Sequence, residues 1–345
     1  MDLHYLLDEI HKKITITKAI CSDDKFCQIP DRINGIPVTE IGNNAFDGCS
    51  SLTKVYLPAT VTKIGEYAFR GCSSLVEINI PNGVKKIGCA TFVGCSSLVK
   101  IDIPDGVTAI GDSAFWGCSS LASVNIPNGI KKIEDSAFSY CSSITLLKLP
   151  ENIKTIERVA FAYCSSLTLI TLPTNLKTIK GGAFRNCSSL LQINIPSGTT
   201  TIGDYAFECC CFLKTAHVPE SVTKIGTAAF GGCSSLRIYG EAGSSIEEYA
   251  KREGLDFVSN DEDDDDDEKE DVWNHKLSQL RSWQLDFMTT DRRIHIYYKG
   301  YAHGIEDGRY GDKYDSYRNP HNNGEYKRGY YDGYDEGCFE RGEWD

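Results

Sequence analysis

Apolar residues recur along most of this chain with a constant period of 23 residues. A Phe marks each repeat, and six residues later stands Leu or a close substitute. A short alternating segment then ends in Pro, as in VYLP and INIP, which indicates a strand with one buried face. A second apolar pair such as Val61 and Ile64 follows, and then often a Gly that permits a turn. The marking residues are Phe46, Phe69, Phe92, Phe115, Phe138, Phe161, Phe184, Phe207 and Phe230.

This period predicts a repeat solenoid of 23-residue leucine-rich-type coils with short parallel strands. A single coil cannot bury its apolar side, so the coils must stack and place equivalent residues in internal columns. With neighbouring strands about 4.8 Å apart, nine coils would form a rod roughly 45 Å long.

A Cys stands three residues after each Phe, usually within GCSSL or a close variant. Cys is small and often buried, so we interpret this column as core filling, with the two following Ser bonded to backbone groups. A line of cysteines does not make the tetrahedron of a zinc site, so we expect no metal. Cys211 and Phe212 replace the two Ser in one turn, which we interpret as simple variation, with a redox pair or a soft metal site as the alternatives. The 15 Cys are an odd number and no export signal is visible, so we predict free thiols.

The repeat resembles that of the BspA-type leucine-rich repeat family, with its pattern I-G-x-x-A-F-x-G-C-x-S-L-x-x-I-x-I-P, over residues 14–258. The resemblance implies an irregular entry coil at ITITKAICSDDKFCQIPDRINGIPVTEIGNNAF and a closing segment at LRIYGEAGSSIEEYAKREGLDFV. Within the closing segment we predict a helix with Ser245 as N-cap and Glu248 completing a capping box. Gly254 should end this helix, and LDFV should add a last strand.

The strand segments should turn the residues that flank each buried position outward, on the surface that solenoids usually offer to partners. This surface is polar and mixed in charge, with an apolar spot at Leu146 and Leu169. A solvated sheet face without a partner is the alternative. The candidate partner-binding residues are Lys54, Tyr56, Glu77, Asn79, Lys100, Asp102, Asn125, Leu146, Lys148, Leu169, Thr171, Gln192 and Asn194.

The composition changes after the repeats. Residues 261–271 hold ten acidic residues and one Lys, so they carry −9 of the formal net charge of −12, and such a run predicts an extended linker. The remainder is rich in Tyr and Gly at helical spacing, which favours a small α-helical module, with a disordered tail as the alternative. We divide the chain into an N-terminal capping segment 1–45, the solenoid 46–239, a C-terminal cap 240–258, an acidic disordered linker 259–271 and a Tyr/Gly-rich helical module 272–345.

Part of that module, residues 297–337, resembles the ribosome modulation factor family, which implies RNA binding. The module has 11 basic and 13 acidic residues, however, and so lacks the basic footprint of an RNA-binding protein. Nucleic acid is therefore not the partner that the sequence favours.

No catalytic motif stands out, since the chain has no HExxH, GxSxG or P-loop pattern. We expect no catalytic residue and no cofactor. No apolar run approaches the length of a membrane span, and the N-terminal apolar run is too short for a signal peptide. We therefore expect a cytoplasmic, non-enzymatic scaffold that binds a protein of unknown identity, with its oligomeric state open. The alternatives are a cell-surface adhesin, which the BspA-type resemblance implies for exported members, and a ribosome- or RNA-associated regulator acting through the C-terminal module.

Overall fold

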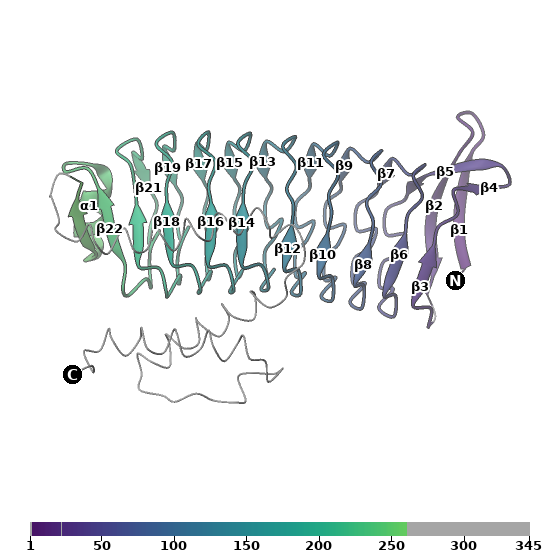
Figure 1. The fold of residues 1–345 in the computed structure, drawn as a ribbon, viewed down its shortest axis with the longest axis horizontal. Coiled ribbons are helices and arrows are strands. Elements are labelled where there is room, and N and C mark those ends of the chain that lie inside the picture. Colours follow the sequence, from purple (N-terminus) through teal and green to yellow (C-terminus); the bar gives the residue numbers. More distant parts are fainter. Residues whose placement is uncertain (1, 22, 261–345) are drawn as a thin grey trace, which may run out of the picture. The chain divides into compact units, whose positions relative to one another are not determined.

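A computed structural model describes residues 2–21 and 23–260. The described residues belong to the first of the chain's two units, Met1–Asp261. The first unit is a parallel β-solenoid whose coils stack one behind the other, with β1 and β2 at its N-terminal end and α1 at its C-terminal end (Figure 1). The predicted fold is confirmed there. The predicted linker from residue 261 onward and the predicted helical module 272–345 lie outside the described residues.

Each coil contributes one strand to each of two rows (Figure 1). The first strand row contains the alternating segments that end before Pro and, at its C-terminal end, two strands that do not. Between Lys54 and His217 the paired residues are 23 apart in parallel register, as Leu146 and Leu169 are. The members of this row are β3 (Phe26–Gln28), β6 (Lys54–Tyr56), β8 (Glu77–Ile78), β10 (Lys100–Ile101), β12 (Ser123–Val124), β14 (Leu146–Lys148), β16 (Leu169–Thr171), β18 (Gln192–Asn194), β20 (Thr215–His217), β22 (Arg237–Gly240) and β23 (Asp256–Ser259).

The second strand row contains the second apolar pair of each coil, and an N-terminal hairpin borders it. In the hairpin, β1 (Asp2–Asp8) runs antiparallel to β2, while β4 (Arg32–Ile33) runs antiparallel to β5. The members of the row are β2 (Lys13–Ile20), β5 (Ile36–Ile41), β7 (Lys63–Ile64), β9 (Lys86–Ile87), β11 (Ala109–Ile110), β13 (Lys132–Ile133), β15 (Thr155–Ile156), β17 (Thr178–Ile179), β19 (Thr201–Ile202) and β21 (Lys224–Ile225).

The nine marking Phe residues form one continuous column in the core. All nine are fully buried, and their rings stack nearly parallel with centroids 5.0 to 5.5 Å apart. At the C-terminal end Tyr249 of the helix closes the column, because its ring meets Phe230 edge-on and its hydroxyl accepts the Phe230 N–H at 3.1 Å. The helix therefore covers the last apolar face, as a terminal repeat must.

The Cys column lies beside the Phe column and forms a ladder of hydrogen bonds between coils. Each of eight thiols donates to the carbonyl of the Phe one coil earlier, at 3.1 to 3.3 Å, as Cys141 does to Phe115. The Ser hydroxyls also bond to backbone, but between coils rather than within one turn, as Ser119 does to the carbonyl of Ser96. Each of these cysteines therefore fills space in the core and also donates a hydrogen bond to a buried carbonyl.

The Gly corners have a different cause from the predicted one. Gly65 does not have a positive φ, and a Cβ there would lie 2.5 Å from Oδ1 of Asn43, so the position needs glycine because the preceding coil is so close. The left-handed conformation occurs instead two residues before and two residues after each Phe. Tyr67 has φ +56° at the first of these positions, and Gly71 has φ +69° at the second.

The C-terminal cap contains α1 (Ser245–Glu253). Ser245 is wrong as the N-cap: Ser244 occupies that position, and Glu247 rather than Glu248 reaches back, accepting the N–H of Gly243 at 2.6 Å. The Ser244 hydroxyl donates instead to the carbonyl of Glu241. Gly254 ends the helix in the left-handed conformation, as predicted, and the following strand β23 runs through Ser259, one residue beyond the expected end of the cap.

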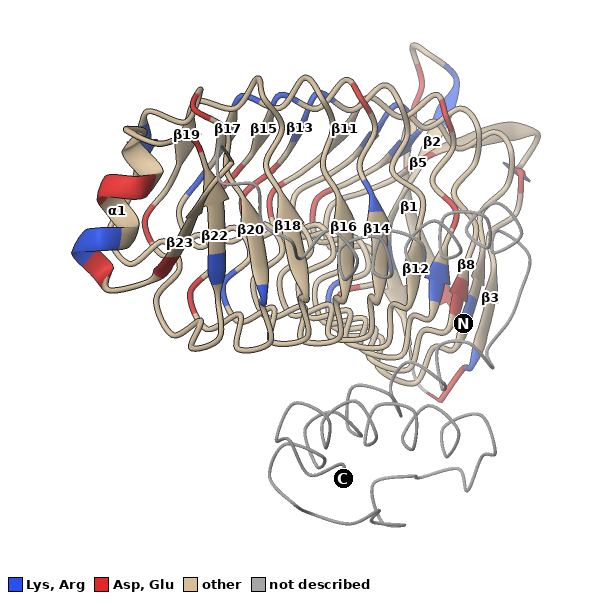
Figure 2. Cartoon of the chain, turned by 60° about the vertical axis from the view of Figure 1, so that its left-hand side comes forward, with Lys and Arg blue, Asp and Glu red and all other residues tan. Residues whose placement is uncertain are grey.

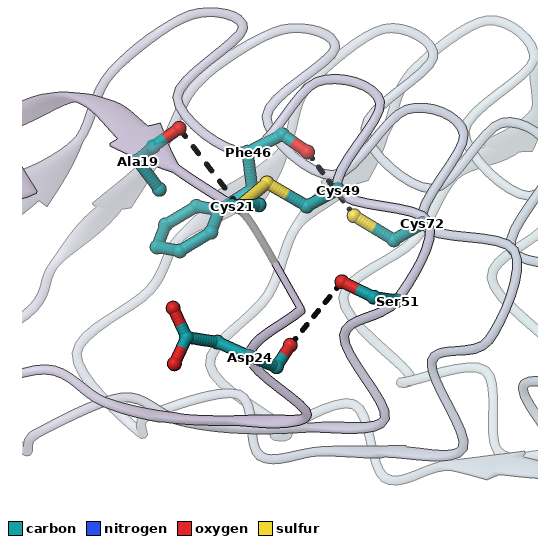
Figure 3. Close-up of a disulfide and its surroundings, with 7 residues drawn as sticks. All are labelled: Ala19, Cys21, Asp24, Phe46, Cys49, Ser51 and Cys72. Atoms are coloured by element: carbon teal, nitrogen blue, oxygen red, sulfur yellow. Dashed lines mark hydrogen bonds between the residues drawn. A yellow bond between two sulfur atoms is a disulfide. The ribbon is translucent and has the colours of Figure 1, made fainter. Parts of the chain in front are cut away.

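A disulfide joins Cys21 of the N-terminal cap to Cys49 of the first coil (Figure 3). The prediction of free thiols throughout is therefore wrong at these two residues, although the other twelve cysteines of the described part are free. Cys49 begins the Cys column, and in the cap Ala19 occupies the place of the marking Phe, because its N–H bonds to the carbonyl of Ala45 as that of Phe46 bonds to the carbonyl of Ala68. The hydroxyl of Ser51 also bonds to the carbonyl of Asp24, so the cap is joined to the first coil at a second point.

Candidate functional site

The outward face of the first strand row presents two columns of side chains, one on each side of the buried central residue. In β14 and β16 the central residue is buried, while Lys148 and Thr171 are exposed. The predicted partner-binding residues all lie on or beside this face, since each belongs to a member of the first strand row or directly follows one. The structure therefore brings them together as one surface along the solenoid.

Ion pairs neutralise the N-terminal part of this face. Lys54 contacts Glu77 of the next coil at 2.8 Å, and Lys100 contacts Asp102 of its own coil at 3.1 Å. Tyr56 is 48 % exposed at this end, and Phe26 on the preceding coil is 52 % exposed. Exposed pairs of this kind contribute little to stability, and their charges are already matched within the chain.

Two of the predicted residues have a structural role. The side-chain amide of Asn79 accepts the N–H of Leu57 and donates to its carbonyl, both at 2.8 Å. Asn125 does the same with Ile103, at 2.9 and 2.7 Å. Each amide stands directly after a strand of only two residues, β8 or β12, and satisfies backbone groups one coil earlier, so both amides are committed to the fold.

The central part of the face carries the apolar spot. Leu146 lies directly under Leu169 in the parallel register, and both side chains are half-buried. Leu191, also half-buried, stands on the next coil beside Gln192. Lys148, Thr171 and Asn194 are exposed around this group, whose members are Leu146, Leu169, Leu191, Lys148, Thr171, Gln192 and Asn194 and which we call the leucine patch.

Sequence reasoning missed two groups of exposed apolar side chains. Val76 and Val99 stand one residue before their strands and are 47 % and 48 % exposed. On the edge formed by the Phe turns, Tyr140 stacks on Tyr163 with centroids 4.3 Å apart, and Trp116 meets Tyr140 edge-on. The signal for these tyrosines is visible in the repeat, because Tyr replaces the Gly of GCSSL in two successive coils.

The cysteines offer no reactive centre in the core. Burial raises the pKa of Cys72, Cys118 and Cys164 to about 12, because a thiolate there would be removed from water. Within residues 2–21 and 23–260 no group of three His, Cys, Asp or Glu side chains could hold a metal ion. At the triple-cysteine turn Cys210 is buried in the column, and the exposed Cys211 lies 3.5 Å from the carbonyl of Cys209.

No helix of the described part is both long enough and apolar enough to cross a membrane.

The C-terminal end of the face is closed by aromatic and charged contacts. His217 stacks on Tyr239 with ring centroids 4.6 Å apart, and Arg237 contacts Asp256 at 2.9 Å.

Comparison with known proteins agrees with this architecture. A leucine-rich repeat protein from Bacteroides ovatus is 27% identical, covers 69% of this chain and 83% of its own, and superposes with a TM-score of 0.50. A leucine-rich repeat protein from Treponema pallidum is 26% identical, with coverages of 74% and 95% and a TM-score of 0.43. None of the curated proteins matches the chain. The family model for the BspA type leucine rich repeat region, in six copies, matches residues 39–168 and 108–237. With its 23-residue coils, its Phe and Cys columns and this match over more than half of its length, the chain belongs to the BspA-type leucine-rich repeat family.

Proposed function

We propose that the chain is a non-enzymatic scaffold that binds a protein through the leucine patch. The observation that carries the proposal is the pair Leu146 and Leu169, stacked in register on the outward side of the strands. An apolar centre with a polar rim is the usual composition of a protein interface. Membership of a repeat family whose members present extended surfaces supports the same role.

The N-terminal part of the first strand row is less suited to a partner. Its charges form ion pairs within the chain, and the amides of Asn79 and Asn125 serve the backbone. A partner that covered these residues would have to break existing contacts before it gained new ones. The leucine patch involves no such loss, because no hydrogen bond of its Leu side chains is possible.

The test is affinity capture with the full chain from the cell that makes it, followed by mass spectrometry. We expect L146D/L169D to lose a specific protein that the unchanged chain retains, because two charges would be buried at the contact. The control T62D/T223D adds the same charge at exposed positions beside the second strand row and should retain it. Equal capture by both variants, with unchanged circular dichroism spectra, would remove the leucine patch from the proposal.

A second candidate is the same scaffold working at the cell surface. The observation in its favour is the Cys21–Cys49 disulfide, because disulfides persist in oxidising compartments and are rare in the cytosol. Protease treatment of intact cells should then release fragments of this solenoid. Retention of the whole chain inside protease-treated cells, with Cys21 and Cys49 both open to alkylation, would favour the cytoplasmic scaffold.

The third function concerns residues 272–345, which lie outside the described residues. A ribosome- or RNA-associated role of this segment stays a prediction from its resemblance to the ribosome modulation factor family. It would show as cosedimentation with ribosomes that weakens as salt rises. The absence of cosedimentation at low salt would end it.

A further inference from the structure

One position of each coil is occupied by either Thr or Lys. It is the residue directly before the second-row strand, and it is exposed in every repeat from Thr62 onward. Backbone bonds hold these residues one above another, as in the 2.9 Å contact from the N–H of Lys154 to the carbonyl of Lys131. From the N-terminal side the series reads Thr62, Lys85, Thr108, Lys131, Lys154, Lys177, Thr200 and Thr223.

Three lysines follow one another in the middle of this series. We call Lys131, Lys154 and Lys177 the lysine row. The N–H of Lys177 bonds to the carbonyl of Lys154 at 2.8 Å, so the three residues belong to directly adjacent coils. Neighbouring coils are about 4.8 Å apart, and the row therefore spans roughly 10 Å with three positive charges on one side of the solenoid. Blue segments, which mark Lys and Arg, lie on the coils around β13, β15 and β17 in Figure 2.

The lysine row is costly to the fold. Where Thr occupies the position, its hydroxyl donates to the carbonyl of the coil before, as Thr108 does to Lys85 and Thr200 does to Lys177, both at 3.3 Å. Lys cannot make this local bond. Like charges on directly opposed positions of neighbouring strands also destabilise a sheet. A departure from the local rule without a structural gain is expected at functional positions.

The nearby carboxylates are engaged with other partners. Glu134 contacts Lys132 at 2.8 Å, and Glu157 contacts Lys180 at 2.6 Å. Asp135 contacts Arg158 at 3.2 Å, and Glu151 accepts both the N–H and the hydroxyl of Thr174. Within the described part of the chain the structure shows no ion pair for any lysine of the row, and the Lys177 amine donates only to the carbonyl of Gly198, at 3.2 Å.

A column of hydroxyls runs beside the lysine row. Thr155 and Thr178 follow Lys154 and Lys177, Thr201 follows Thr200 on the next coil, and the three threonines pair in parallel register. Lys132 holds the equivalent place beside Lys131. All three are half-buried, and no hydrogen bond of the Thr155 or Thr178 hydroxyl is shown. Ammonium groups and hydroxyls thus lie side by side along the direction in which the coils stack.

We propose that the lysine row and this threonine column bind an acidic polysaccharide that runs along the solenoid axis. Its carboxylates face the ammonium groups, and its hydroxyls bond to the threonines. A sugar unit in an extended glycan advances by about the same distance as one coil, so carboxylates that face the solenoid at every unit or at every second unit stay in register with the lysines. The surface belongs to the second strand row and is separate from the leucine patch, so each proposal can fail alone.

Other polyanions fit the same surface less well. In an extended acidic peptide the side chains on one face recur at roughly 6.8 Å, twice the rise per residue, which does not match the coil spacing of about 4.8 Å. Single-stranded nucleic acid is usually held by aromatic side chains on which the bases stack, and the row and its threonine column contain none. The row contains lysine and no arginine, and lysine binds an anion as a single point charge, whereas planar, bidentate recognition of an anion requires arginine.

The test measures binding of the full chain to polygalacturonate by biolayer interferometry at about 50 mM and about 200 mM NaCl, a range over which polyanion binding changes steeply. The variant K131T/K154T/K177T places at each position the residue that other coils already use. The control K18T/K25T/K148T removes the same charge from exposed lysines outside this surface. Fully methyl-esterified polygalacturonate tests the need for charge, and polyaspartate and oligo-dT test the alternative polyanions.

We expect the row variant to bind about tenfold to a hundredfold more weakly. The slope of log binding constant against log salt concentration should fall by the equivalent of about two to three charge contacts. The control should stay within about twofold, and the esterified polymer should not bind. No binding of polygalacturonate at about 50 mM NaCl, or equal loss in both variants, would overturn the proposal. Tighter, row-dependent binding of polyaspartate or oligo-dT would overturn the assignment to a polysaccharide. A melting temperature of the row variant at or above that of the unchanged chain shows that any loss is not unfolding.

Discussion

Reduction of the Cys21–Cys49 disulfide should loosen the N-terminal cap and leave the rest of the solenoid intact. The bond closes a loop with a sequence separation of 28 residues. The chain-entropy relation gives about 3–4 kcal/mol for a loop of that length. Because each coil contacts only its neighbours, this free energy acts on the cap and the first coils rather than on the whole rod.

Native-state hydrogen exchange can locate the effect. After reduction, the backbone amides of β2 and β5 should lose about two to three orders of magnitude of protection, which corresponds to the loss of about 3–4 kcal/mol of opening free energy. Amides of β16 and β18 should keep theirs. The variant C21S/C49S should show the reduced pattern without reductant, and adding reductant to it should change nothing more.

Two results would refute this reasoning. Unchanged protection in β2 and β5 after complete reduction would mean that the hydrogen bonds of the cap, including that of Ser51 to Asp24, hold it without the disulfide. An equal loss across all coils would mean that the rod unfolds as one cooperative unit rather than from its end.

Three further predictions follow from the columns and corners. Phe161→Ala removes a fully buried ring stacked on both sides at 5.5 Å and should cost about 3–5 kcal/mol in urea unfolding, whereas a loss below about 2 kcal/mol would show that the column closes over the gap. Gly65→Ala should lower the melting temperature more than Gly48→Ala, because a Cβ at Gly65 meets Asn43 at 2.5 Å while Gly48 faces open space and has only its φ of +74° against it. Burial raises the folded pKa of the column thiols, so their contribution to stability is full below the unfolded value of 9.0 and lost between pH 9 and about 12. This should give a steep alkaline unfolding above pH 9, by about 1.4 kcal/mol per pH unit for each thiol, and a gradual one would contradict it. These thiols are Cys72, Cys118, Cys164 and Cys233.

The repeat period made the solenoid predictable, because the marking Phe recurs nine times at a constant spacing and the alternating segments recur with it. Gly254 was also predictable, since a helix stop by glycine is a local property. The N-cap was missed by one residue: Ser244 and Ser245 both satisfy the capping pattern, and only the position of Glu247 relative to Gly243 decides between them.

Contacts between coils were beyond sequence reasoning. Asn79 and Asn125 look like exposed polar residues, yet each bridges backbone groups 22 residues earlier in the chain. The Cys21–Cys49 bond joins the irregular cap to the first coil, where paired residues are 28 rather than 23 apart, so the repeat period does not predict that these two cysteines meet. The sequence predicted a turn at the corner Gly, but the glycine is needed because the preceding coil lies so close. That distance between coils cannot be deduced from the sequence of one coil.

The regularity of the repeat makes its departures informative, and they gather in the same three coils. Glu134, Glu157 and Lys180 replace the corner Gly there, and the ladder of the second strand row breaks between β11 and β13, where these replacements begin. The lysine row, the stacked Tyr140 and Tyr163, and the paired Leu146 and Leu169 occupy the same stretch on three different sides. Some of these departures have a conformational cost, since Tyr140 and Tyr163 adopt φ +61° at a position that Gly occupies in five of the other coils. Independent drift would scatter such changes along nine coils. Their concentration between residues 127 and 192 is better explained if this section meets partners on more than one side, and the coils around it hold it in place.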